Sequence, residues 1–80
     1  MNEQIAEKIK HMISESLRIP EEMLDYDAEL FAGDIGLDSV DSLEIIAGID
    51  DLFGVDMTGV EREHFQTIRT LTNYVEGKLD

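Results

Sequence analysis

Residues 38–54 read DSVDSLEIIAGIDDLFG and carry the clearest helical signal in the chain. Asp38 has the short acidic side chain that caps a helix N-terminus, and Asp41 adds negative charge where the helix dipole favours it. The apolar residues that follow recur at helical spacing, and Gly54 is a residue type at which helices commonly end. We therefore predict a helix that begins at Asp38-Ser39 and runs through Phe53.

This predicted helix has two apolar faces. At about 100° per residue, one face collects large side chains that we expect in a core: Ile45, Ile46, Ile49, Leu52 and Phe53. The opposite face holds Val40, Leu43 and Ala47, and acids surround it: Asp41, Glu44, Asp50 and Asp51. Two interpretations are open. In one, Leu43 turns into the core, and Val40 and Ala47 are small enough to be tolerated at the surface. In the other, this face binds another protein, and the surrounding acids accelerate the encounter.

The other helical segments flank this one. Residues 3–17 repeat apolar side chains at helical spacing, and a helix there should end near Arg18, because the residue before Pro20 is disfavoured in helical geometry. Pro20 can open one helical turn. A short helical turn near residues 60–65 and a last helix capped by Thr67 complete the pattern. We expect an all-α fold, a small four-helix bundle with three main helices, one short helix and a long first loop.

The predicted long loop spans residues 19–37. Loops of this length in a compact domain are often functional. We expect its apolar side chains to pin it to the core: Leu24, Leu30, Phe31 and Ile35.

The charge balance restricts the possible partners. The 80 residues predict a single domain, 1–80, and they include 6 Lys and Arg against 19 Asp and Glu, a formal charge of −13. No basic residue lies between Arg18 and Arg62. Nucleic acid needs a basic footprint, and an anionic membrane surface attracts basic segments, so both are disfavoured as partners. A basic protein partner is favoured instead.

Cysteine is absent, so a disulfide framework and a thiolate metal site are excluded. The N-terminal residues lack the pattern of a secretory signal, and no apolar run approaches the roughly 18 residues of a membrane span. The expected location is the cytoplasm.

The segment 36–44 places Ser39 on the first turn of the predicted helix, directly after a glycine-containing loop. Its hydroxyl should be exposed, and a helix N-terminus favours a phosphate group. Asp38 and Asp41 would repel that phosphate, so these acids are expected to serve a basic partner enzyme.

At these residues the chain resembles the acyl carrier proteins. The matching pattern is a glycine, one residue, and Asp-Ser opening an acidic helix, followed by an apolar residue and a glutamate: Gly36, Asp38, Ser39, Leu43 and Glu44. The resemblance extends over nearly the whole chain. It includes the length, the acidity and three further sequence features: Leu30-Phe31, Phe53-Gly54 and Phe65-x-Thr67.

The resemblance implies that Ser39 carries 4′-phosphopantetheine through a phosphodiester. A phosphopantetheinyl transferase would install this arm from coenzyme A, with Asp38 contributing to its recognition. The terminal thiol would hold acyl groups as thioesters for loading and condensing enzymes with basic docking patches. The implied partner-binding residues are Leu37, Val40, Asp41, Leu43, Glu44, Ala47 and Asp51. The protein would be a monomer that binds no metal and catalyses nothing, and acyl chains would enter the bundle past Ile45, Ile46 and Ile49.

Departures from the family pattern leave the pathway open between housekeeping fatty acid synthesis and a specialised, polyketide-type one. Val40 stands where leucine or methionine is usual, and residues 56–59 lack the usual proline-bearing acidic loop. Leu37 replaces the second glycine of peptidyl carriers. Gly48 inside the helix costs up to about 1 kcal/mol relative to alanine, and it either admits a close neighbour, loosens the helix or is simply tolerated.

Three other functions compete with that of a carrier. A hydrolase needs a base for Ser39, and the two histidines, His11 and His64, are expected at the surface or its boundary. A calcium loop starting at Asp25 would need glycine at its sixth position and glutamate at its twelfth, and it has neither. The third alternative is a carrier-like interaction module that never receives an arm.

Overall fold

The computed structural model describes residues 1–79 and contains three α-helices and two short 3₁₀ helices. The order is α1 (Glu3–Leu17), η1 (Glu21–Met23), α2 (Asp41–Phe53), η2 (Arg62–Phe65) and α3 (Ile68–Leu79). The described residues contain no strand, which makes the fold all-α as predicted. The segment expected to be a short fourth helix is the four-residue η2.

Helix α1 has the predicted bounds, and its side chains explain both ends. The Asn2 carboxamide oxygen accepts hydrogen bonds from the backbone N–H groups of Gln4 at 2.9 Å and Ile5 at 3.2 Å. At the other end, Arg18 adopts a left-handed conformation with φ of 58°, two residues before Pro20. The predicted end near Arg18 is confirmed.

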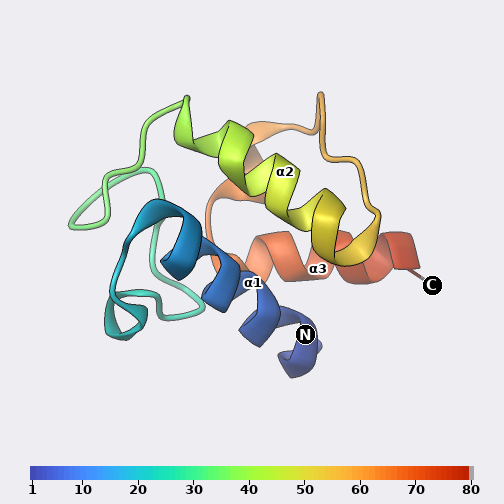
Figure 1. Ribbon diagram of the computed structural model, residues 1–80, viewed down its shortest axis with the longest axis horizontal. Helices are drawn as coiled ribbons and strands as arrows, with labels where there is room; N and C mark the ends of the chain where they lie inside the picture. The colour runs from blue at the N-terminus through green and yellow to red at the C-terminus, as the bar shows by residue number, and fades with distance from the viewer. Residues whose placement is uncertain (80) are drawn as a thin grey trace.

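Helix α1 packs against both other long helices, and α2 and α3 end on the same side of the molecule (Figure 1). The core between them is formed by aliphatic side chains that are less than one tenth exposed, among them Ile9, Ile13, Ile45, Ile49, Ile68, Leu71 and Val75. One expected core residue was placed wrongly. Leu52 is 45% exposed, because it lies near the C-terminal end of α2, beyond the packed centre.

Gly48 admits a close neighbour, which settles the interpretation left open from the sequence. A Cβ atom at this position would lie 2.4 Å from the Met12 sulfur and 2.7 Å from its Cγ. Real Cβ atoms do not approach so closely, and the absence of a side chain therefore leaves room for the Met12 side chain of α1 against α2.

The connection between α1 and α2 is held to the core and to the segment around α3. Leu24 and Leu30 are fully buried, and Phe31 and Ile35 are partly buried against the core, as predicted. The Leu30 N–H donates to the Gln66 carbonyl at 2.9 Å, and the Arg69 N–H donates to the Tyr26 carbonyl at 3.0 Å.

Side chains add two further ties to this connection. Arg69 donates to both oxygens of Asp27, at 2.5 and 3.0 Å, and this guanidinium lowers the pKa of the Asp27 carboxyl. The Tyr26 hydroxyl donates to the Glu7 carboxylate, which raises the pKa of Tyr26 to about 12. Residues 26 and 27 of this connection are therefore tied to α1 and α3.

Candidate functional site

Ser39 lies in a turn that leads directly into α2, instead of in the first turn of the helix as predicted. The assigned helix begins at Asp41, because the first hydrogen bonds are of the tighter three-residue kind. The Asp41 N–H donates to the Asp38 carbonyl at 3.0 Å, and the Leu43 N–H donates to the Val40 carbonyl at 3.1 Å. The predicted start at Asp38-Ser39 was therefore too early.

Asp38 nevertheless performs the capping role that the sequence predicted. Its Oδ1 accepts hydrogen bonds from the N–H groups of Val40 at 3.1 Å and Asp41 at 3.4 Å. The Asp41 carboxylate in turn accepts from the Asp38 N–H at 3.0 Å. This reciprocal arrangement has the logic of a capping box, and it holds the turn that presents Ser39.

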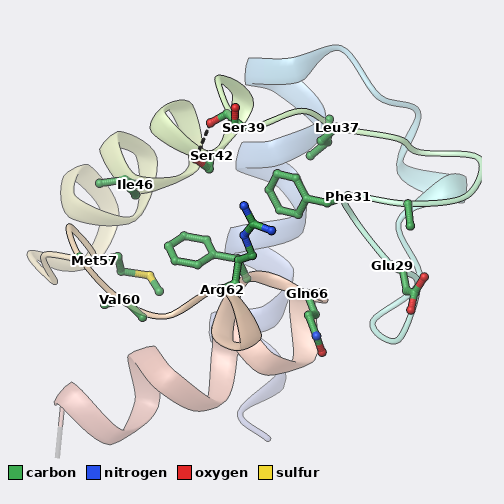
Figure 2. Close-up of a pocket in the computed structure, with 13 residues that line it drawn as sticks. Glu29, Phe31, Leu37, Ser39, Ser42, Ile46, Met57, Val60, Arg62 and Gln66 are labelled. Atoms are coloured by element: carbon green, nitrogen blue, oxygen red, sulfur yellow. Dashed lines mark hydrogen bonds between the residues drawn. The ribbon is translucent and has the colours of Figure 1, made fainter.

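The Ser39 side chain is exposed, and its hydroxyl has no hydrogen-bonded partner among residues 1–79. Its backbone carbonyl accepts from the Ser42 hydroxyl at 2.6 Å (Figure 2). The backbone is therefore anchored while the hydroxyl remains accessible to an external reagent.

The second apolar face of α2 points to solvent. Val40 is 67% exposed and Leu43 is 63% exposed, and Ala47 is exposed as well. Leu43 does not turn into the core, which removes that alternative. Glu44, Asp50 and Asp51 are also exposed, and Asp41, which accepts from the Asp38 N–H, is half-buried. The structure thus brings together an apolar centre and an acidic rim beside Ser39.

A pocket of about 520 Å³ adjoins Ser39 (Figure 2). Its wall includes Phe31 and Leu37 from the first connection, Ile46 from α2, and Met57 and Val60 from the second connection. Leu37, named from the sequence with the partner-binding residues, is half-buried in this wall.

The three isoleucines expected beside an acyl chain divide between the core and this pocket. Ile45 and Ile49 are fully buried in the core, and of the three isoleucines only Ile46 borders the pocket. Sequence reasoning also missed Arg62 and Gln66, which contribute polar groups to the wall. Periodicity along α2 could not have found them, because they come from η2 and the turn that follows it.

The two histidines are far from forming a catalytic group. His11 is exposed and lies 3.6 Å from Glu15 on α1, and His64 packs its ring against Tyr74 with centroids 5.0 Å apart. The boundary positions expected from the sequence are confirmed. Within residues 1–79, no three His, Asp or Glu side chains are grouped so that they could hold a metal ion.

Comparison with known proteins identifies the family. The family model described as a phosphopantetheine attachment site matches residues 7–75. The chain belongs to the acyl carrier protein family. An acyl carrier protein of Thermosynechococcus vestitus is 31% identical over 76 residues, which cover 95% of this chain and 93% of the relative. The acyl carrier protein of Thermotoga maritima is 32% identical over 77 residues, covering 96% and 94%.

Acyl carrier protein 3 of Ralstonia nicotianae is also similar, with 32% identity over 78 residues, 98% of this chain and 88% of the relative. The prosthetic group of this family is a covalently attached 4′-phosphopantetheine. When bound, this group supplies a flexible arm ending in a thiol that holds acyl groups as thioesters. An exposed, unpartnered hydroxyl next to a pocket fits the attachment of such an arm in this acyl carrier.

Proposed function

We propose that this acyl carrier receives its 4′-phosphopantetheine at Ser39 and presents acyl thioesters to a series of biosynthetic enzymes. The observation that supports Ser39 is its hydroxyl, exposed and without a partner among residues 1–79, while its backbone is held by the turn before α2. A phosphodiester formed there would project from the protein and could also reach the adjacent pocket.

We propose that a phosphopantetheinyl transferase with a basic surface installs the arm. Asp38 and Asp41 flank Ser39, and their charge disfavours a free phosphate bound to the same turn. The same charge attracts a cationic partner, and the overall charge of −13 extends that attraction over a longer range. Asp38 therefore has two roles in this proposal, capping the turn and attracting the transferase.

The exposed α2 face is the proposed docking surface for loading and condensing enzymes. Val40, Leu43 and Ala47 supply apolar contact, and Glu44 and Asp51 supply orienting charge. Leu37 lies at the edge of this region and contributes to the pocket wall.

The pocket beside Ser39 is the proposed shelter for the acyl group. Cavities of roughly 300–1,000 Å³ hold small ligands, and a volume of about 520 Å³ falls in that range. Phe31, Ile46 and Met57 supply apolar wall on three different segments. The short η2 helix, which stands where a fourth helix was expected, contributes Arg62 and Phe65 to the wall.

In this proposal residues 1–80 act as one monomeric cytoplasmic domain without catalytic activity of its own. The positions of His11 and His64 support that assignment, since neither is hydrogen-bonded to Ser39. None of the helices within residues 1–79 has the length and apolar character that crossing a bilayer requires. Fatty acid synthesis and polyketide-type synthesis are both compatible with the proposed site.

Intact-mass measurement separates this proposal from an interaction module that carries no arm. The protein is incubated with coenzyme A, magnesium and a transferase of broad specificity. The expected result is a mass gain of one phosphopantetheine in the wild type and in Ser16→Ala, which removes an exposed hydroxyl on α1, and none in Ser39→Ala. Equal gains in all three proteins, or no gain with several transferases, would contradict it.

A further inference from the structure

Arg62 is a charged residue in the wall of the pocket that Ser39 adjoins. It is the first residue of η2, and it is the first basic residue of the chain after Arg18. Figure 2 shows its guanidinium directed into the pocket, beside Phe31 and toward the side that Leu37 and Ser39 form. The role proposed above for the pocket, sheltering an acyl group, gives this cation no function.

The guanidinium forms no ion pair with any residue among 1–79, although the chain is strongly acidic. The carboxylate of Glu29, the acid that also borders the pocket, points away from it (Figure 2). Arg69 offers a contrast, because it makes two hydrogen bonds to Asp27. A guanidinium stays protonated and its best partners are carboxylates and phosphates, which it binds with two parallel hydrogen bonds.

The backbone that carries Arg62 is fixed relative to the opposite wall. The His64 carbonyl accepts a hydrogen bond from the Thr70 hydroxyl at 3.0 Å, and Phe65 is buried in the core. The Gln66 carbonyl accepts from the Leu30 N–H at 2.9 Å, which ties η2 to the segment that carries Phe31. These contacts constrain the backbone of η2, from which the exposed Arg62 side chain reaches the pocket.

We infer that Arg62 binds an oxyanion brought into this pocket by the arm on Ser39. The oxyanion is either the phosphodiester of the arm or a carboxylate on the attached acyl group; both offer the guanidinium the same pair of acceptor oxygens. The inference rests on the proposed attachment at Ser39. A neutral acyl chain that covered the guanidinium would displace water molecules from it without offering hydrogen-bond acceptors in their place. The pocket therefore favours acyl groups that carry acid or polar substituents over long saturated ones.

Nuclear magnetic resonance of the Arg62 Nε–H group tests the inference and separates the two sources. The signal is identified by its loss in Arg62→Gln. The signal is then followed in four forms of the protein. Two are the protein without the arm and with the free arm. In the other two the arm carries a butyryl group or a succinyl group, which have the same number of carbon atoms. A downfield shift on attachment of the arm indicates the phosphodiester, and a shift confined to the succinyl form indicates the carboxylate. An unchanged signal in all four forms would overturn the inference.

Stability provides a second readout with a matched control. If the carboxylate is the ligand, the succinyl form should melt at a higher temperature than the butyryl form in the wild type. The same difference should persist in Lys8→Gln, which removes one exposed charge outside the pocket, and should be lost in Arg62→Gln and partly kept in Arg62→Lys. If the phosphodiester is the ligand, the melting temperatures to compare are those of the protein with the arm and without it. A difference that survives Arg62→Gln contradicts the inference.

Intact mass is measured on every sample. A protein that gains the arm but shows no Arg62 response overturns only the role of Arg62. A protein that gains no arm overturns the attachment at Ser39 and this inference together.

Discussion

Substitution of Gly48 by alanine is expected to destabilise the protein, although alanine is the better helix former. The gain in helix propensity is about 1 kcal/mol. Against it stands a new Cβ placed 2.4 Å from the Met12 sulfur, 2.7 Å from its Cγ and 2.8 Å from its methyl carbon. Overpacking of this kind costs about 1–3 kcal/mol, so the free energy of unfolding should fall by roughly 0–2 kcal/mol.

Gly48→Ala should become stabilising when Met12 is replaced by alanine. In a Met12→Ala background the Cβ no longer meets the thioether, and Gly48→Ala should add about 1 kcal/mol. The coupling energy between the two positions is then about 1–3 kcal/mol. Gly77→Ala is the matched control, because it lies in α3 with no atom within 4 Å of its added Cβ and should stabilise by up to about 1 kcal/mol.

Urea denaturation of the four members of the cycle and of the control, followed by circular dichroism, gives these free energies. If Gly48→Ala stabilised the wild type as much as Gly77→Ala does, Met12 would be moving aside without cost. The close packing of α1 and α2 at this point would then not be the reason for the glycine.

Other predictions concern the docking face and the ion pair that holds the first connection. Replacing both Glu44 and Asp51 by lysine should slow installation of the arm by the transferase roughly tenfold at low salt. The helical content should not change. If the double variant received the arm as fast as the wild type, these acids would have no part in recognition. Leu43→Ala should change stability by less than about 0.5 kcal/mol yet weaken partner binding by about 1 kcal/mol or more, as titration calorimetry would show. Arg69 lowers the pKa of Asp27 in the folded state. The ion pair therefore stabilises the folded protein fully at pH values above the unfolded pKa of about 3.9. This stabilisation is lost as the pH falls through the lowered pKa of the folded state. Melting temperatures of the wild type and Asp27→Asn should therefore differ at pH 7 and converge toward pH 2; a constant difference would contradict this.

The ends of the helices were largely predictable, because they depend on local chemistry. Thr67 caps α3, with its hydroxyl accepting from the Thr70 N–H at 3.1 Å while the Thr70 hydroxyl accepts from the Thr67 N–H at the same distance. Gly54 ends α2 in a left-handed conformation with φ of 68°. Such features need only neighbouring residues, which the sequence supplies directly.

The extent of each buried face was less predictable, because it depends on where the other helices end. Leu52 belongs to the apolar face of α2 by its angle, yet no element covers it fully. In the same way, the sequence placed Val40 and Leu43 on a second face but left open whether Leu43 was buried. Only the packing of α2 against α1 showed that it is exposed.

The candidate site was predictable in its central residue but not in its pocket. Asp38 and Ser39 were marked by capping chemistry and by the resemblance to acyl carrier proteins, and the structure places the hydroxyl at the surface. The pocket wall joins Phe31, Ile46 and Arg62, which are far apart in the chain. No local pattern connects residues that meet only through the tertiary fold.

Peptide-level mass spectrometry of protein loaded from butyryl-coenzyme A by a transferase tests the central claim most directly. We predict that the peptide containing Ser39 carries the butyryl-phosphopantetheine group. Hydroxylamine should remove the butyryl group as expected for a thioester and leave the arm on that serine. A butyryl-phosphopantetheine group found on another residue, or an unmodified Ser39 peptide after complete reaction, would contradict the account.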